Sequence, residues 1–362
     1  MINYPTITRY VAKLFTKQFL AVSAIVICVL FITSAFDILQ KFKSTQISSS
    51  IFWQLIALKV PFLFSEVSNL VCFIATLVFL RSITKNNEML ILLSSGVPTW
   101  QIFIIPIIVT FFLGLFVLSV LNPIGAYGLR EYEKLETKVT GAHHLNFVIS
   151  QSGIFFFEKF AENNRIIQAK SINAEQSTLT NVTILLLDKR NNFIKRIDAS
   201  QAILAPGVFK LVDLNVTSKE KSQKLDQLDL PTKLSIDNLM QRFTPPEMIP
   251  IWDLGSSIEK FSKSGLSITR YQIHYYKQLF KPFAMVAMSF VACWFLSLNL
   301  RDNSGAKLAF LGLILGMCTY FFLEMALRIL TYSGLPPALA TILPILFIIL
   351  ISNFVILHFQ EA

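Results

Sequence analysis

Charged residues are scarce in this sequence. Asp, Glu, Lys and Arg make up 15% of its 362 residues, whereas hydrophobic residues make up 54% and phenylalanine alone occurs 33 times. Soluble domains carry about 25% charged residues, so this composition indicates a membrane protein. The formal net charge is +10, but the basic residues are scattered and form no dense basic run. The charge balance therefore does not indicate a nucleic-acid partner.

Cysteine is also rare, and its positions do not indicate a metal site. The four cysteines all lie inside apolar segments, and no two have the spacing of zinc ligands: Cys28, Cys72, Cys293 and Cys318. We interpret them as small, buried apolar side chains. Two adjacent histidines, His143 and His144, occur in the turn-like stretch "GAHHLN". Neighbouring side chains point to opposite faces of a strand, so we do not expect these two to share a metal ion.

The sequence motifs of nucleotide hydrolysis and of serine hydrolases are absent. Only 13 glycines occur, and none belongs to the pattern G-x-x-x-x-G-K-[ST], whose backbone cradles ATP phosphates. The G-x-S-x-G pattern of a nucleophile elbow is missing as well. We therefore predict a chain that is not an enzyme and needs no cofactor. If it drives uphill transport, the energy has to come from a separate ATPase.

Six apolar stretches reach the length of a membrane-spanning helix when polar interruptions are allowed. They cover residues 14–36, 54–80, 101–121, 275–298, 306–331 and 337–358. The first stretch is long and lacks a small-residue cleavage site, so we expect it to be retained rather than cleaved as a signal peptide. Three spans precede residue 122 and three follow residue 272, which leaves a different kind of region between them.

The region between the spans holds most of the charge and most of the Asn, Gln, Asp and Ser. β-rich runs such as "GIFFFEKF", "RIIQAKSI" and "VFKLVDLNVTS" recur between the turn signals "ENN", "KRNN" and "APG". In the last run, alternation places two sets of residues on opposite faces: Leu211, Asp213 and Asn215 against Val212, Leu214 and Val216. Repeated short strands without helices predict a β-sandwich, a jelly roll or an open barrel.

The predicted fold is therefore an α+β membrane protein. Six transmembrane helices, in a 3+3 arrangement, enclose an inserted β-jellyroll-like domain. The expected boundaries are residues 1–127 for the first three helices, 128–250 for the β domain and 251–362 for the last three helices.

Lysine and arginine concentrate beside one set of span ends, which predicts the orientation in the membrane. One side carries seven of them: Arg9, Lys13, Lys17, Arg81, Lys85, Arg301 and Lys307. The opposite side carries two, Lys41 and Lys43, and the "YSGLPP" loop has none. We therefore expect both termini in the cytoplasm. The bias also places the β domain outside; if the cell is Gram-negative, that is the periplasm, with the chain in the inner membrane.

The stretch "NNEMLILLSSGVPTW", Asn86–Trp100, carries the signals of a complete short helix between spans two and three. An asparagine can cap its start, and Glu88 suits the positive end of the helix dipole. Gly96 is a residue type that ends helices, and Pro98 prevents the helix from resuming. The apolar run Met89–Leu93 is too short to cross a bilayer, so it must contact something else.

Two interpretations of this short helix remain open. In the first, the helix lies flat on the bilayer and Trp100 anchors it among the lipid headgroups. Alternatively, it is a coupling helix that docks in a groove of a cytoplasmic partner. Leu90 and Leu93 would then fill that groove, and Glu88 would pair with a basic residue of the partner.

Charged residues within or beside the spans are costly in a membrane, so each needs a physical reason. Four lie near the outer ends of spans one and two: Asp37, Lys41, Lys43 and Lys59. The lysines are either headgroup anchors or a site for anionic lipid phosphates, with Asp37 holding Lys41 one helical turn on. Glu66 falls in span two. Glu324 and Arg328 fall in span five at a spacing that allows them to pair.

Two apolar features are candidates for contact with lipid. Small residues mark one side of span five: Ala309, Gly312 and Gly316. They permit close helix packing, or they form a seam that opens sideways to admit a lipid. In "GIFFFEKF", Phe155 and Phe157 fall on one strand face and Phe156 on the other. These rings form either a sandwich core or an apolar groove for acyl chains.

Over its whole length, the chain resembles the LptF/LptG family, the permease subunits of the lipopolysaccharide exporter. The segment "LRSITKNNEMLILLSSGVPTW" is similar to the family's coupling segment "sR.sE..a.raaG.s.w", with Glu88, Gly96 and Trp100 in place. The beginning "RYVAKLFTKQFL" with "FDILQKF", and the ending "SGLPPALATILPILF", resemble the G-type member more than the F-type. One departure is Leu90–Leu93, where relatives are often rich in alanine and arginine.

The resemblance implies a permease that pairs with an LptF-like subunit and is driven by an LptB ATPase dimer, with Glu88 as the mechanical contact. It implies lipopolysaccharide as the substrate, taken from the outer leaflet and passed to LptC and a periplasmic LptA-like β-jellyroll bridge. Basic residues at the outer end of span one then line the lipid cavity. Spans one and five form a lateral gate across the heterodimer, and the β domain hands lipid to its neighbour.

Two other functions fit parts of the sequence. A membrane-anchored periplasmic scaffold or sensor without transport needs no ATPase, so it would tolerate charge reversal at Glu88. A stand-alone secondary transporter would need ionisable residues at mid-membrane and an inverted repeat with broken spans. Only Glu66, Glu324 and Arg328 meet the first requirement, and the hydropathy pattern contains no such repeat.

Overall fold

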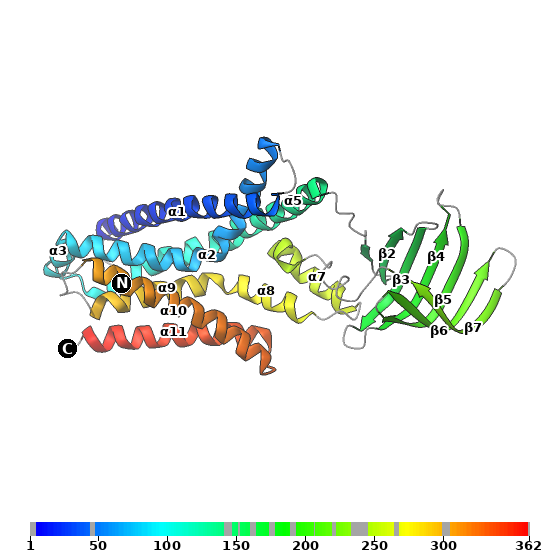
Figure 1. Cartoon of the computed structure of the whole chain (residues 1–362). Helices are drawn as coiled ribbons and strands as arrows, with labels where there is room; N and C mark the ends of the chain where they lie inside the picture. The colour runs from blue at the N-terminus through cyan, green and yellow to red at the C-terminus, as the bar shows by residue number, and fades with distance from the viewer. Residues whose placement is uncertain are drawn as a thin grey trace. The chain divides into compact units, whose positions relative to one another are not determined.

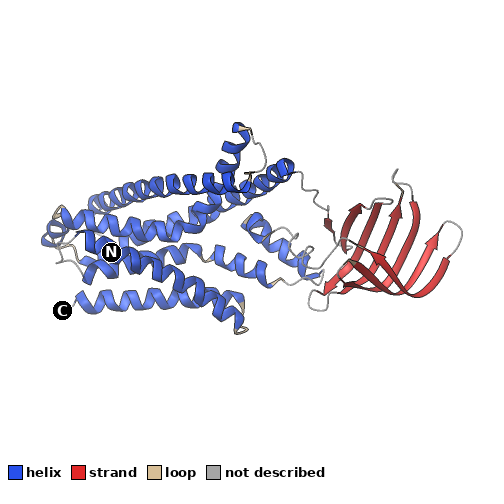
Figure 2. Cartoon of the chain, viewed as in Figure 1, coloured by secondary structure: helices blue, strands red, loops and turns tan. Residues whose placement is uncertain are grey.

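Helices form both ends of the chain and strands form its middle (Figures 1 and 2). The structure, a computed structural model, describes residues 5–43, 48–140, 147–150, 153–159, 164–173, 178–188, 193–205, 207–218, 222–232, 245–263, 268–298 and 305–360. Two units separate by their contacts: a helical unit of residues 1–139 with 272–362, and a β unit of residues 140–271.

The helical unit consists of long apolar helices that run side by side (Figure 1). Its first half contains α1 (Pro5–Lys41), α2 (Ser49–Lys85), α3 (Glu88–Ser94), α4 (Thr99–Phe116), the π-helical turn η1 (Val117–Leu121) and α5 (Asn122–Thr140). Its second half contains most of α8 (Thr269–Leu279), then α9 (Lys281–Leu298), α10 (Gly305–Tyr332) and α11 (Pro337–Gln360). Both chain ends lie at the end of this bundle that carries α3, here called the α3 end (Figure 1).

The described helices account for the six predicted spans. Five are long and apolar enough by themselves: Thr6–Lys41, Ser49–Lys85, Thr99–Val139, Lys307–Tyr332 and Pro337–His358. α8 and α9 pass the same test together, although they are bent by 55° at the break between them. Pro282 explains the break, because proline lacks a backbone N–H and disfavours helical geometry at the residue before it. The 3+3 order is as predicted when this bent pair counts as one span.

The predicted domain boundaries need correction. The third span continues as helix to Thr140, beyond residue 127 where we expected the β domain to begin, and the first described strand starts at Phe147. The two units separate between residues 139 and 140 and between residues 271 and 272. The charged run "LREYEKLETK" misled the prediction, because it continues a helix beyond the apolar segment instead of ending it.

The core of the helical unit lies along α2 and α9. Phe73 and Phe79 of α2 are fully buried there. Buried hydroxyl groups also cross this core: Thr76 Oγ1 donates to Ser289 Oγ at 3.1 Å, and the Ser289 and Thr110 hydroxyl oxygens are 3.1 Å apart. Interhelical hydrogen bonds of this kind satisfy polar groups that would otherwise be costly in an apolar interior. They connect α2, α9 and α4.

Gly114 allows α4 to pack directly against α9. A Cβ atom at this position would lie 2.6 Å from the Pro282 Cα atom and 2.9 Å from its Cβ atom. Because the obstacle includes backbone, Gly114→Ala must push the two helices apart. We expect it to cost about 1–3 kcal/mol of stability, the usual range for an overpacked core. Thermal unfolding of the detergent-solubilised chain measures this loss.

Gly255→Ala is the matched control for that experiment. Gly255 lies in a helix, and a Cβ atom added there meets nothing within 4 Å. Alanine is a better helix former than glycine, so this variant should be as stable as the parent or slightly more so. Equal stability of the two variants would contradict the close approach at Gly114.

The β unit contains one antiparallel sheet in which the strands follow one another in chain order. Its strands are β1 (Phe147–Ser150), β2 (Gly153–Lys159), β3 (Asn164–Asn173), β4 (Thr178–Leu187), β5 (Phe193–Ala205), β6 (Val208–Ser218) and β7 (Ser222–Pro231). The short helix η2 (Pro246–Met248) and α7 (Ile251–Lys263) belong to the same unit. The predicted α+β class with a β domain is confirmed. The described strands form one seven-stranded meander.

A crease runs across the middle of this sheet. Asn181 of β4 and Asp213 of β6 have positive φ angles of 48° and 51°, and by register both stand opposite Ser200 of β5. On all three strands the buried positions change from a spacing of two to a spacing of three at this row: Leu179 and Val182, Ala199 and Ala202, Leu211 and Leu214. The prediction that Leu211 and Leu214 face opposite sides is therefore wrong, because Asp213 resets the alternation.

The crease allows the sheet to roll toward its apolar face. Arg165 of β3 donates through Nη1 to the Pro231 carbonyl oxygen at the end of β7, 2.5 Å away. These two strands are not neighbours in the sheet, so their ends meet only because the sheet curls. Phe156 and Ile167 pair across β2 and β3 and are both buried on the enclosed side.

Candidate functional site

The short helix predicted between spans two and three is α3, and backbone geometry defines both of its ends. Asn87 precedes it in the left-handed conformation with φ 58°. At the other end, Gly96 has φ 81° and donates its N–H to the Leu93 carbonyl oxygen at 3.0 Å. The Val97 N–H reaches the Leu92 carbonyl oxygen at 3.2 Å, which completes a Schellman cap. Gly96 thus ends the helix as the sequence indicated.

α3 has one buried side and a broad exposed side. Met89 is only 5% exposed and packs into the core of the helical unit. Leu90 is 70% exposed, and Ile91 and Leu93 are exposed as well. Met89 and the partly buried Leu92 therefore fix the helix to the bundle, while three large apolar side chains point outward. Both predicted contact residues, Leu90 and Leu93, belong to this exposed surface. We call Glu88, Leu90, Ile91 and Leu93 together the elbow.

Glu88 is held toward the start of α1. The Tyr10 hydroxyl donates to Glu88 Oε2 at 3.1 Å, and Asn86 Nδ2 lies 3.5 Å from Oε1. These contacts orient the Glu88 carboxylate beside the apolar side chains of the elbow. Sequence reasoning missed Tyr10, because it is 78 residues away and no local pattern connects the two.

Three of the four predicted phosphate-binding residues take part in ion pairs at the end of the bundle opposite α3. Lys59 Nζ lies 3.1 Å from Asp37 Oδ2, and Lys41 Nζ lies 2.5 Å from Glu136 Oε1 of α5. The expectation that Asp37 holds Lys41 is therefore wrong. Lys43 is exposed at the end of α1. No local pattern pointed to Glu136, which approaches Lys41 because the third span continues as α5.

These two ion pairs come together around a small apolar cluster. Ile38, Leu55 and Tyr132 are buried there and hold α1, α2 and α5 in contact. Side chains of both pairs are partly exposed, so each pair contributes at most about 1 kcal/mol. Neither lysine is therefore held tightly by its carboxylate partner.

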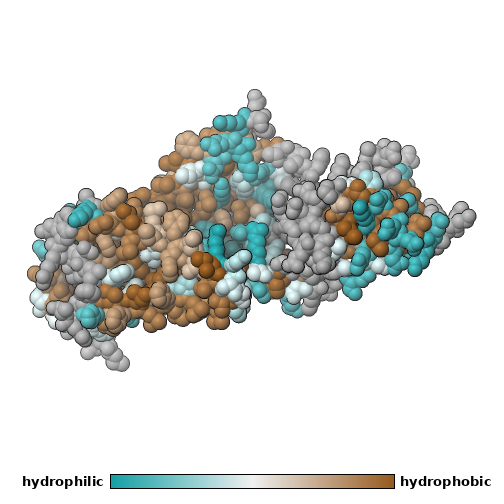
Figure 3. Space-filling model, turned by 60° about the horizontal axis from the view of Figure 1, so that its bottom comes forward, coloured by the Kyte–Doolittle hydropathy of each residue, from teal (hydrophilic) through white to brown (hydrophobic). Residues whose placement is uncertain are grey.

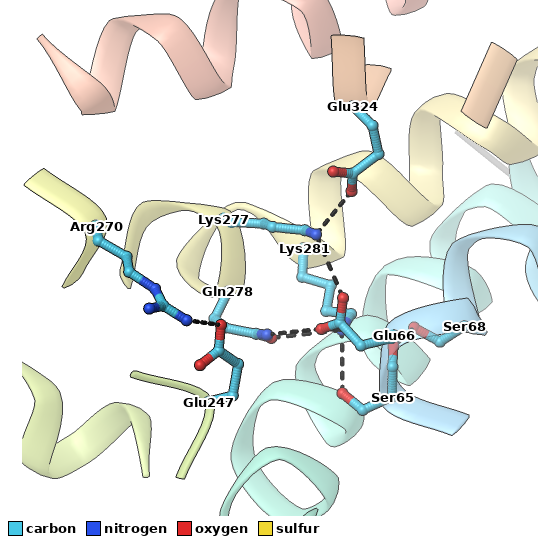
Figure 4. Close-up of polar contacts among 9 residues, drawn as sticks. All are labelled: Ser65, Glu66, Ser68, Glu247, Arg270, Lys277, Gln278, Lys281 and Glu324. Atoms are coloured by element: carbon cyan, nitrogen blue, oxygen red, sulfur yellow. Dashed lines mark hydrogen bonds and ion pairs between the residues drawn. The ribbon is translucent and has the colours of Figure 1, made fainter. Parts of the chain in front are cut away.

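A second charged cluster connects α2, α8, α9 and α10 (Figure 4). We call it the buried charge network; its members are Ser65, Glu66, Lys277, Gln278, Lys281 and Glu324. Lys277 Nζ lies 2.7 Å from Glu324 Oε1 and 3.3 Å from Glu66 Oε2. The predicted pairing of Glu324 with Arg328 is wrong, because Lys277 binds this carboxylate and Arg328 is exposed.

Lys281 is the most enclosed charge of the network, with 4% of its side chain exposed. Its Nζ donates to Ser65 Oγ at 3.0 Å and lies 3.8 Å from Glu66 Oε1. Gln278 Nε2 donates to the same Oε1 at 3.2 Å. The charges lie at similar distances from the α3 end of their helices. Glu66 is 19 residues before the end of α2, Lys281 is 17 residues before the end of α9, and Glu324 is 19 residues after the start of α10. At 1.5 Å per residue, 17–19 residues span ~26–29 Å, close to one hydrocarbon thickness.

The small residues of α10 face helices of the same chain. A Cβ atom on Gly312 would approach Leu77 and Phe295, and one on Gly316 would lie 2.5 Å from the Phe73 ring. Gly312 thus packs against α2 and α9, and Gly316 packs against α2. Ala309 is exposed and lines a pocket beside these helices.

The remaining candidates are only partly described. Phe156 is buried in the β unit and Phe155 is half-buried, whereas the Phe157 side chain, His143 and His144 lie outside the described residues. Cys72 and Cys293 are buried as expected. Cys28 and Cys318 are exposed on α1 and α10, which corrects that expectation: in a membrane-spanning bundle, apolar segments expose one face.

Comparison with known proteins shows similarity to a permease family and to one of its named members. Residues 9–358 match the family model of the lipopolysaccharide export system permease LptF/LptG. The chain is also 20% identical to the lipopolysaccharide export system permease protein LptG of Haemophilus influenzae, over 97% of this chain and 98% of that protein.

Proposed function

Because this chain belongs to the LptF/LptG family of lipopolysaccharide export permeases, we propose that it is one permease subunit of a heterodimeric ABC transporter. Together with an LptF-like partner it extracts lipopolysaccharide from the outer leaflet of the inner membrane and passes it to a periplasmic β-jellyroll bridge. The observation that carries the mechanism is the elbow: a short helix that offers apolar side chains and one oriented carboxylate at the end of a spanning bundle.

The elbow suits a protein groove better than a bilayer. Leu90, Ile91 and Leu93 would be satisfied by either environment, but Glu88 is a charge beside them. A lipid surface gives this carboxylate little stabilisation, whereas a protein groove with a basic residue gives it a charge-assisted hydrogen bond. The partner is an LptB-like ATPase dimer, since the chain itself has no phosphate-binding loop. Movement of that dimer would pull α3 and, through Met89, the bundle.

The substrate phosphates would bind at the opposite end of α1 and α2. There the weak ion pairs Asp37–Lys59 and Lys41–Glu136, with Lys43 close by in sequence, present ammonium groups that phosphate can attract. Exchange of a carboxylate partner for a phosphate would favour binding without leaving a lysine unpaired. Release would restore the internal pairs.

Of the five single-helix spans that the structure describes, α1 and α10 are the least enclosed. Only 22% of the apolar window of α1 and 17% of that of α10 is buried, compared with 56% for α2. Figure 3 shows the apolar surface on one face of the helical unit. These two helices are therefore the ones with most surface to offer a partner subunit or a lipid, which fits a lateral gate across the heterodimer. Gly312 and Gly316 would then act indirectly, by fixing α10 to α2 and α9.

Purification from the native membrane tests the proposed function. The full chain is extracted in mild detergent, and the co-purifying proteins and lipids are identified by mass spectrometry. We expect an ATPase, an F-type sibling and lipopolysaccharide in stoichiometric amounts. A chain that purifies without any ATPase would support the alternative of a membrane-anchored scaffold or sensor and contradict the transporter.

A further inference from the structure

An apolar pocket with a volume of about 390 Å³ lies between α1, α2, α9 and α10 near the α3 end of the helical unit. Its lining includes Ile74, Leu77, Phe295 and Leu313. This volume falls within the usual range for small-molecule sites, about 300–1,000 Å³. The pocket is separate from the proposed substrate-phosphate site, because the candidate phosphate-binding lysines lie at the other ends of α1 and α2, although α1 and α10 are also the proposed gate helices.

The pocket changes from apolar to cationic along one face of α2. Leu77 and Val78 line its apolar part, Arg81 follows one helical turn later, and Lys85 lies one turn beyond, at the last residue of the helix. Ser82 and Gln18 add hydroxyl and amide groups to the lining. A ligand that fits this lining has an apolar chain and an anionic head.

The depth of the cations matches a lipid headgroup. α2 ends at Lys85, and a spanning helix places its last turn at the boundary between hydrocarbon and headgroups. α10, which forms one wall, is the least buried of the five described single-helix spans, so a lipid can enter from the side. Ala309 on that wall is small and exposed, which leaves room for such an entry.

We propose that this pocket binds one anionic phospholipid from the membrane leaflet at the α3 end. Its phosphate lies at Arg81 and Lys85, and one acyl chain runs along Leu77 and Leu313. The apolar channel accommodates an acyl chain of any lipid, and the opposite charge at Arg81 and Lys85 favours an anionic lipid over a neutral one. The inference requires only that the chain spans a membrane and does not depend on the export cycle.

The position of this lipid gives it a structural role at the base of the elbow. Lys85 is followed directly by Asn86, whose side chain contacts Glu88. A lipid phosphate on Lys85 would therefore hold the last turn of α2, from which α3 departs. The lipid is in this sense a resident component of the bundle and not cargo.

Native mass spectrometry of the full chain tests the proposal. Delipidated protein in detergent is titrated with phosphatidylglycerol, phosphatidylcholine or lipid A. We expect one tightly bound phosphatidylglycerol, and roughly tenfold weaker binding of it to the Arg81→Gln/Lys85→Gln variant, because both cations near the phosphate are lost. Lys17→Gln, which removes an exposed cation of α1 that does not line the pocket, should bind as the parent does.

A second variant separates loss of the site from loss of the fold. Ala309→Phe keeps both cations but places a ring where the acyl chain would enter, so it too should lose the bound lipid. Circular dichroism confirms that each variant is folded before binding is compared. The proposal is overturned if phosphatidylcholine binds as well as phosphatidylglycerol, if lipid A displaces it, or if either folded variant binds at parental strength.

Discussion

Reversing the charge of Glu88, as Glu88→Lys, is expected to abolish ATP-driven lipid export while the helical unit stays folded. The lysine would place an ammonium group against a basic groove of the ATPase, and like charges in an interface cost several kcal/mol. It would also replace the carboxylate that the Tyr10 hydroxyl now contacts at 3.1 Å. We expect binding of the ATPase to weaken by at least about 100-fold, as measured by pull-down and by titration in detergent.

Two further variants show whether the loss depends on the negative charge and on its position at Glu88. Glu88→Gln keeps an acceptor for the Tyr10 hydroxyl but removes the charge, so it should bind the ATPase with intermediate strength. Glu131→Lys reverses an exposed acid of α5, whose present partner is Lys134, and should leave binding unchanged. If the Glu88→Lys variant binds the ATPase as strongly as the Glu131→Lys control does, the elbow lies on the bilayer and does not contact the ATPase.

Removal of Glu66 should cause the largest loss of stability from a single carboxylate. Glu66→Ala leaves Lys281, with 4% of its side chain exposed, without a carboxylate partner and leaves Lys277 with Glu324 alone. Breaking a buried ion pair from one side costs about 3–5 kcal/mol, because the remaining charge stays desolvated. Thermal unfolding in detergent measures the loss, which should exceed that of Gly114→Ala.

The double variant Glu66→Leu/Lys281→Met distinguishes an unpaired charge from lost packing. With both charges replaced by apolar side chains of similar size, most of the stability should return. Glu131→Ala, which breaks an exposed ion pair, should leave the stability nearly unchanged. A double variant no more stable than Glu66→Ala would contradict the assignment of the loss to an uncompensated charge.

Local sequence patterns predicted the elements of this fold well. The spans follow from apolar length, and α3 follows from Glu88, Gly96 and Pro98, whose preferences act within a few residues. The β unit was recognised from its turns and strand-forming runs. Its crease was not, because an asparagine or aspartate in the left-handed conformation at Asn181 and Asp213 leaves no signature in an alternating pattern.

The pairing of charges was predicted poorly, and for one reason. Rules based on helical spacing joined Asp37 to Lys41 and Glu324 to Arg328, each one turn apart. In the structure these acids pair instead with Lys59 and Lys277, on other helices. Partners of this kind depend on how helices pack, and the bend before Pro282 decides where Lys277 and Lys281 lie. One sequence carries no direct record of such contacts.

The most direct test of the account is release of lipopolysaccharide from proteoliposomes that contain this chain, its F-type partner and the ATPase. A soluble periplasmic β-jellyroll acceptor is added outside, and transferred lipid is counted after ATP addition. The account predicts transfer that requires ATP and this chain, and that ceases with Glu88→Lys. Equal transfer without ATP, or undiminished transfer by the Glu88→Lys complex, would contradict it.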